Sequence, residues 1–156
     1  APLVKSSGGS GLPVAVPLAA RYTYEVARQF AELVARTLHA RLPELTTLER
    51  MPAKRAVGTV YLDYVQVGKG KTLVAPYSAR ARAKAPVSMP LDWSEIEAMA
   101  RKRAKETESE FARFTLKNVP ALLGERGDLW DERAWRPQRL EPALEAAQAK
   151  WREDFA

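Results

Sequence analysis

The sequence predicts an α/β (α+β) fold, a mixed sheet flanked by helices, in a single domain over residues 1–156. Residues 3–18 are typical of two short strands joined by a glycine-rich turn. Residues 24–41 place apolar side chains at helical spacing. Residues 57–66 are rich in β-branched and aromatic residues on both alternating faces, which is typical of a strand covered on both sides.

Composition and charge restrict the kind of protein. A 46% hydrophobic content in 156 residues allows one sizeable core, and the net charge of +6 favours acidic partners, of which nucleic acid is the commonest. The absence of cysteine and the single histidine, His39, exclude disulfides, thiolate sites and a multi-histidine zinc site. With no secretory signal and no apolar run near the ~20 residues of a membrane helix, we expect a cytoplasmic protein without a membrane partner.

The first half begins with an edge strand and a long helix. Pro13 and Pro17 lack amide hydrogens, so we expect the second strand to lie at an unpaired edge. Thr23 is the expected N-cap of a helix that runs to about Arg41, and Pro43 ends it. The expected apolar stripe of this helix comprises Val26, Phe30, Leu33, Val34, Leu38 and Leu42. His39 lies off the stripe and is expected in solvent.

The middle of the chain predicts a hairpin and a basic loop. Residues 72–75 are expected to pair with the 57–66 strand across a glycine turn. Three prolines predict that residues 76–91 form an extended basic loop. Ser94 and Glu97 predict a capping box for a charged helix that continues to residue 111.

Three elements are expected to close the chain. Residues 114–119 predict a final strand, a short helix follows from Pro120, and a terminal helix runs from Glu141 to about Trp151.

Asp63 lies in the middle of the apolar 57–66 segment. A buried carboxylate must be paired, protonated or bound to a metal, because an isolated buried charge is too costly. Basic, glycine-broken segments follow at residues 68–71 and 75–82. An acid on a strand followed by such a loop indicates phosphate chemistry.

Five blocks together resemble the polymerase domain of bacterial DNA ligase D, a member of the archaeo-eukaryotic primase superfamily. They are residues 4–14, 60–66, 68–71, 75–82 and 85–91. The resemblance covers almost all of this chain, but only about the C-terminal half of the family domain. It implies a primase-like fold and a role in DNA repair by non-homologous end joining. It also implies nucleotidyl transfer with two divalent metals, Mg or Mn, held by acidic side chains.

The resemblance assigns a degenerate metal site. Asp63 matches the acid of the family's third motif and is the candidate catalytic and metal-binding residue. The two aspartates of the first motif would precede residue 1. Ser7, Gly8 and Gly9 match the second motif and could present amides to a phosphate, but its lysine is Ser10 and its histidine is Pro13.

Further family positions are lost, whereas a basic segment is retained. The expected arginine, lysine and asparagine near the Asp63 strand are replaced by Ala56, Thr59 and Val67. The residues that match the family's phosphate-binding segment are Lys71, Ser78, Arg80 and Arg82, together with Tyr77. Arg80 is the best candidate for a bidentate phosphate contact. Alternatively, Arg80 forms a structural ion pair with Asp63 or binds a helix C-terminus, Asp63 belongs to such a buried pair, and Ser7–Gly9 is a plain turn.

Three functions therefore stay open. The first is a catalytically degenerate relative that needs no cofactor and retains weak, salt-sensitive binding of nucleic acid or nucleotide phosphate. The second is one half of a split nucleotidyltransferase, with Mg or Mn at Asp63 and a complementary polymerase half on another chain. The third is a structural or interaction module without nucleic-acid binding. We also expect a homodimer, or coverage of an exposed face by residues 94–111.

Overall fold

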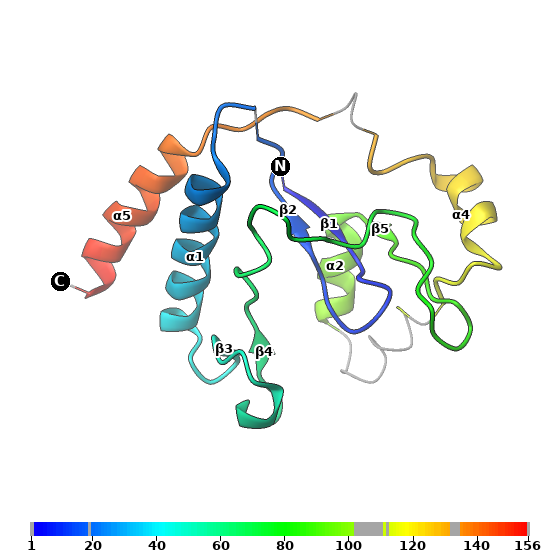
Figure 1. Ribbon diagram of the computed structural model, residues 1–156, viewed down its shortest axis with the longest axis horizontal. Helices are drawn as coiled ribbons and strands as arrows, with labels where there is room; N and C mark the ends of the chain where they lie inside the picture. The colour runs from blue at the N-terminus through cyan, green and yellow to red at the C-terminus, as the bar shows by residue number, and fades with distance from the viewer. Residues whose placement is uncertain (1, 19, 102–110, 112, 132–134, 156) are drawn as a thin grey trace. The chain divides into compact units, whose positions relative to one another are not determined.

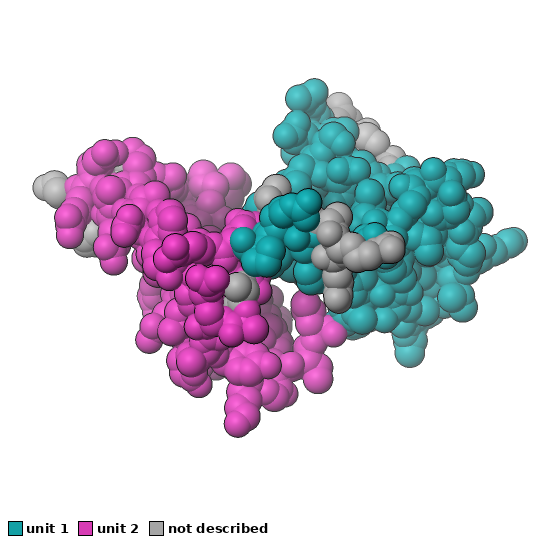
Figure 2. All heavy atoms as spheres, turned by 90° about the horizontal axis from the view of Figure 1, so that it is seen from above, with its two compact units in different colours: residues 1–17, 74–137 teal, residues 18–73, 138–156 magenta. Residues whose placement is uncertain are grey.

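The computed structural model describes residues 2–18, 20–101, 111, 113–131 and 135–155 (Figure 1). The chain forms two compact units, each built from two separate segments (Figure 2). Unit 1 comprises Ala1–Pro17 and Val74–Pro137, and unit 2 comprises Leu18–Leu73 and Gln138–Ala156. Among the described residues, no helix is both long and apolar enough to cross a membrane.

A three-stranded antiparallel sheet forms the centre of unit 1. Strands β1 (Leu3–Lys5), β2 (Val14–Ala15) and β5 (Pro90–Leu91) lie in the order β2-β1-β5 (Figure 1). Val4 pairs with Val14 on one side and with Leu91 on the other. In this sheet β2 is an edge strand, so the prediction from Pro13 and Pro17 is confirmed.

The core of unit 1 brings the sheet together with later parts of the chain. Phe114 has no exposed surface, and Met99 comes from helix α2 (Trp93–Ala100). The buried cluster comprises Val4, Val87, Met89, Leu91, Met99, Phe114 and Val119. Residues 87–91 are thus buried, which corrects the expectation that the whole of 76–91 is an extended basic loop.

Helix α2 starts earlier than the sequence predicts. Asp92 is its N-cap, and the Asp92 N–H donates to Glu95 Oε2 at 2.9 Å. The expected capping box of Ser94 and Glu97 is therefore wrong by two residues. An N-cap must stand where the chain leaves the strand, and β5 ends at Leu91. The rest of the expected helix, residues 102–110, lies outside the described residues.

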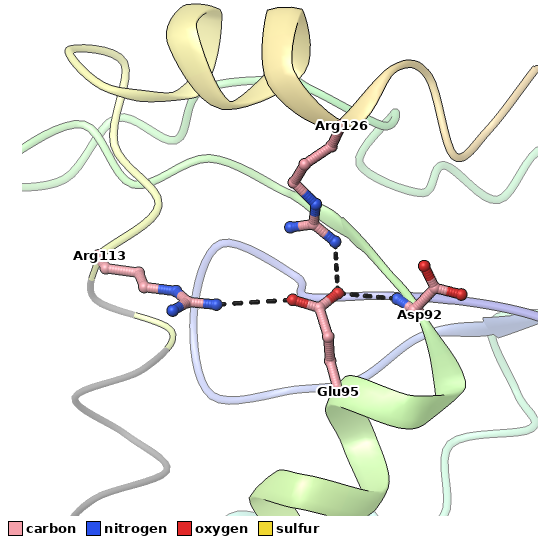
Figure 3. A network of polar contacts seen from close by, with 4 residues as sticks. All are labelled: Asp92, Glu95, Arg113 and Arg126. Carbon is pink, nitrogen blue, oxygen red and sulfur yellow. Dashed lines mark hydrogen bonds and ion pairs between the residues drawn. The ribbon is translucent and has the colours of Figure 1, made fainter.

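Glu95 joins three segments of unit 1 (Figure 3). One carboxylate oxygen accepts from Arg126 on helix α4 (Val119–Arg126) and from the Asp92 N–H. The other lies 3.5 Å from Arg113 Nη2. The side chains of Glu95 and Arg126 are 24% and 22% exposed, so this pair is more sheltered than an ordinary surface ion pair.

The expected strand at 114–119 is a turn in the structure. Only Thr115 makes a β-bridge, to Pro86, and its N–H donates to Asn118 Oδ1 at 2.8 Å. This side-chain bond closes the turn, because asparagine can replace a backbone acceptor. The predicted helix near Pro120 is confirmed and begins at Val119.

Two helices dominate unit 2, and they lie side by side in Figure 1. Helix α1 (Tyr24–Arg41) has Thr23 as its N-cap, and helix α5 (Glu141–Phe155) starts where the sequence predicts. The Tyr22 hydroxyl donates to Glu141 Oε2 at 2.8 Å and accepts from the Leu140 N–H at 3.0 Å. These bonds connect the starts of the two helices.

Two expectations for α1 need correction. Much of its apolar stripe is exposed, Val34 and Leu38 included, whereas Ala35 is its buried residue. His39 is partly buried and not simply solvated, because its Nδ1 lies 3.0 Å from the Thr46 hydroxyl in strand β3 (Thr46–Thr47). Periodicity identifies an apolar face but not the element that covers it.

The central apolar segment forms only a short strand. Strand β4 (Val60–Tyr61) pairs with β3 in parallel, beyond the 3-10 turn η1 (Pro52–Lys54). Val57 and Val60 are exposed, so the expected 57–66 strand buried on both sides is wrong. Residues 72–75 do not form its expected hairpin partner.

Candidate phosphate-binding site

A glycine turn connects β1 to β2 and is held closed by Ser7. The Ser7 N–H donates to the Gly11 carbonyl at 2.9 Å, and the Gly11 N–H donates to Ser7 Oγ at 3.1 Å. Gly8 has a φ of +67°, a conformation that glycine adopts without strain. Ser10, which lies in the same turn, is exposed.

A second tight turn carries Arg80 and Arg82. The Arg80 N–H donates to the Pro86 carbonyl at 2.8 Å, and the Ala85 N–H donates to the Arg82 carbonyl at 2.9 Å. Lys84 and Ala85 have positive φ values of 65° and 44°. The turn leaves Arg82 exposed and Arg80 half-buried.

The two turns lie against each other. A Cβ atom on Gly8 would be 2.6 Å from Arg80 Cγ, and one on Gly9 would be 3.2 Å from Arg82 Nη1. The backbone of the first turn and the two arginine side chains of the second are therefore direct neighbours in unit 1. Guanidinium groups and glycine-turn amides are both suited to phosphate oxygens.

Ser78 belongs to the same unit as the two arginines, and a backbone hydrogen bond holds it against a buried residue. Its carbonyl accepts from the buried Ser88 N–H at 2.9 Å, and Ala79 bridges Val87. The neighbouring Tyr77 hydroxyl donates to Asp128 Oδ1 at 2.6 Å. Burial, and then this bond to Asp128, raise the pKa of Tyr77, so the phenol stays protonated. This segment fixes the backbone before the arginine turn.

Lys5 is a residue of this region that the sequence analysis missed. Its side chain is 1% exposed, and Nζ donates to Ser88 Oγ at 2.5 Å. Burial first, and then the positive charge of Arg80, lower the pKa of Lys5 to about 8. The available signal was a lysine inside an apolar strand, directly before the serines and glycines of the turn.

Asp63 and Lys71 belong to unit 2. Contrary to expectation, Asp63 is exposed, and in the part of the chain that the structure describes it accepts only a long bond of 3.4 Å from the Tyr61 hydroxyl. Lys71 is exposed at the end of the turn that starts at Gly68. Within the described ranges, no three acidic or histidine side chains come together as a metal site would require.

The fold places the chain in the class of mixed α/β primase-polymerase domains. The structure is similar to that described as the polymerase domain from Mycobacterium tuberculosis ligase D in complex with DNA. The TM-score is 0.68 at 29% identity, over 82% of this chain and 41% of that chain.

The chain belongs to the LigD primase-polymerase domain family, whose family model matches residues 1–130. The multifunctional end-joining protein LigD of Pseudomonas aeruginosa is 30% identical over 143 residues, 90% of this chain and 16% of that protein. The bifunctional LigD of Bacillus subtilis is 40% identical over 94 residues, 60% of this chain and 15% of that protein. The chain thus spans about one sixth of the length of these relatives, and the resemblance inferred from the sequence is confirmed.

Proposed function

We propose that this chain binds the phosphate groups of nucleic acid or nucleotide in DNA end joining, and that it does not transfer nucleotides by itself. The observation that carries the proposal is the contact of Gly8 with Arg80 and of Gly9 with Arg82. It combines two guanidinium groups with a glycine turn in one unit. Family membership, and a structural relative described in complex with DNA, agree with such a ligand.

The chemistry of the surface favours phosphate over a neutral ligand. Among the described residues, no carboxylate forms an ion pair with Arg80 or Arg82, so their charge is uncompensated. Phosphate contacts of this kind position a nucleic acid but do not read its sequence. We therefore expect binding that depends on salt and not on base sequence.

We expect no independent catalysis because of the acids that residues 1–156 supply. Two magnesium ions need several carboxylates besides the phosphate oxygens, and Asp63 is the acid that matches a metal motif. Pro13 can neither donate to a phosphate nor bind a metal where the family has histidine. Ser10 likewise lacks the charge of the family's lysine.

A second candidate function rests on Asp63 itself. Its carboxylate is exposed and makes no ion pair with a described residue, so it is available to a metal. A complementary chain that supplies the two aspartates of the first motif would then complete a split nucleotidyltransferase. Such a complex would extend a primer with Mg or Mn only when both chains are present.

Fluorescence anisotropy with a labelled single-stranded oligonucleotide tests the main proposal. We expect binding at low salt that weakens steeply as salt rises. Arg80→Gln should weaken it about tenfold for every sequence, since a charged hydrogen bond is lost. Arg28→Gln removes the same charge from the exposed surface of α1 and is the matched control. No binding at low salt, or equal losses in the two variants, would refute the proposal.

A further inference from the structure

Lys5 is a buried cation at the centre of the unit 1 sheet. Its Nζ donates to Ser88 Oγ, and this hydroxyl donates in turn to the Ser6 carbonyl at 2.8 Å. Ser6 Oγ donates to the Val87 carbonyl at 3.2 Å and accepts from the Met89 N–H at 2.9 Å. The Ser88 hydroxyl thus holds the ammonium group, and the bonds of Ser6 fix the backbone around Ser88 just before β5.

Among the described residues, no carboxylate pairs with Lys5 to balance its charge. The neighbouring residues of β2 and β5 are uncharged, and Arg80 is the described charged group whose field acts on Lys5. The described ion pairs do not include Lys5 or Arg80. A buried ammonium beside a second cation is unfavourable until an anion compensates it.

Lys5 lies behind the glycine turn rather than on its surface. A Cβ atom on Gly8 would be 3.3 Å from the Ser88 nitrogen, and Ser88 is the residue that accepts from Lys5. The same Cβ would be 2.6 Å from Arg80 Cγ. Gly8 is therefore packed against both Arg80 and the residue that accepts from the ammonium group.

We propose that Lys5 is a positioning residue of the phosphate site, a buried cation that stabilises an anion bound at Gly8 and Arg80 without touching it. As a consequence, phosphate binding takes up a proton at mildly alkaline pH. A bound anion favours the charged ammonium, so the complex holds more protons than the free chain. This inference rests on the proposed function and adds the coupling to Lys5.

The first test measures affinity for inorganic tripolyphosphate against pH, by calorimetry at constant low salt. With the Lys5 pKa near 8 in the free chain, a rise of half to one unit on binding weakens affinity about three- to sevenfold between pH 7 and 9.5. Lys5→Met should remove the part of this dependence that Lys5 causes, whereas Lys117→Met, at an exposed lysine outside the site, should keep it. The chain's amino-terminal group also titrates in this range, so the difference between the variants is the quantity to compare.

The second test observes Lys5 directly and needs no substitution. Carbon NMR of the lysine side chains should show a Lys5 titration midpoint that moves upward when tripolyphosphate is added. Binding that persists while this midpoint stays constant would overturn the inference and leave the proposed function intact. Absence of tripolyphosphate binding at every pH would overturn the proposed function and the coupling with it.

Discussion

Gly8 and Arg80 fit against each other only while residue 8 has no side chain, because a Cβ atom there would lie 2.6 Å from Arg80 Cγ. Gly8→Ala must therefore displace Arg80 and also adopt a φ of +67°. We expect the free energy of unfolding to fall by about 1–3 kcal/mol, and oligonucleotide affinity to fall as well.

Gly70→Ala is the control for this change. Gly70 has a similar φ of +74°, and a Cβ there would meet nothing within 4 Å. Urea unfolding should show only the backbone cost of about 1 kcal/mol, with unchanged oligonucleotide affinity. If both variants lose the same stability and affinity, the contact with Arg80 has no role.

The network around Glu95 predicts a stability loss on Glu95→Gln (Figure 3). The change leaves the sheltered guanidinium of Arg126 without its carboxylate and weakens the contact with Arg113. We expect a loss of about 1–2 kcal/mol in urea unfolding. Glu32→Gln disrupts an exposed pair with Arg36 on α1, and its cost should stay near 0.5 kcal/mol. A cost at Glu95 no larger than this would contradict the prediction.

Buried Lys5 predicts that the chain becomes more stable as pH rises. Its pKa is about 8 in the folded chain and 10.5 as the ordinary value, so the unfolded chain binds more protons between these values. The free energy of unfolding should therefore increase by about 1–2 kcal/mol from pH 8 to 9.5. Above pH 10 the raised pKa of Tyr77 acts in the opposite direction, which sets the upper limit of the experiment. Unfolding curves of wild type and Lys5→Met that change in parallel would refute the assignment.

The chain alone should not extend a primer or add ribonucleotides with magnesium or manganese. Asp63 lacks further described carboxylates with which to form a metal cluster. A gel-based extension assay checks this, with an active LigD polymerase domain as the positive control. Template-dependent extension that Asp63→Ala abolishes would show that the chain completes the metal site by itself.

Local signals in the sequence predicted both ends of helix α1 and the starts of helices α4 and α5. Thr23 and Pro43 mark the start and the end of helix α1, because a cap hydroxyl and a proline act within one turn of the backbone. Pro13 and Pro17 predicted the edge position of β2 for the same local reason. The ordered blocks from residue 4 to residue 91 predicted the family, since together they record the order of motifs along the chain.

Burial could not be predicted in the same way. Asp63 was expected in a covered strand, yet β4 ends at Tyr61 and leaves the carboxylate exposed. Lys5, in contrast, is a charged residue that is buried, because Ser88, 83 positions away, accepts its hydrogen bond in the core. Alternation of residue types shows which face of a strand is apolar, but it does not show which element packs on that face.

The sequence by itself thus determined the family, the main helices, and Arg80 and Arg82 of the candidate site, because these depend on neighbours along the chain. Only the tertiary structure decided that Gly8 lies against Arg80 and that Lys5 is buried behind them. Both results arise where β1 pairs with β5 and two distant turns pack together. That packing lowers the pKa of Lys5 and excludes a side chain at position 8, because desolvation and steric overlap depend on distance in space.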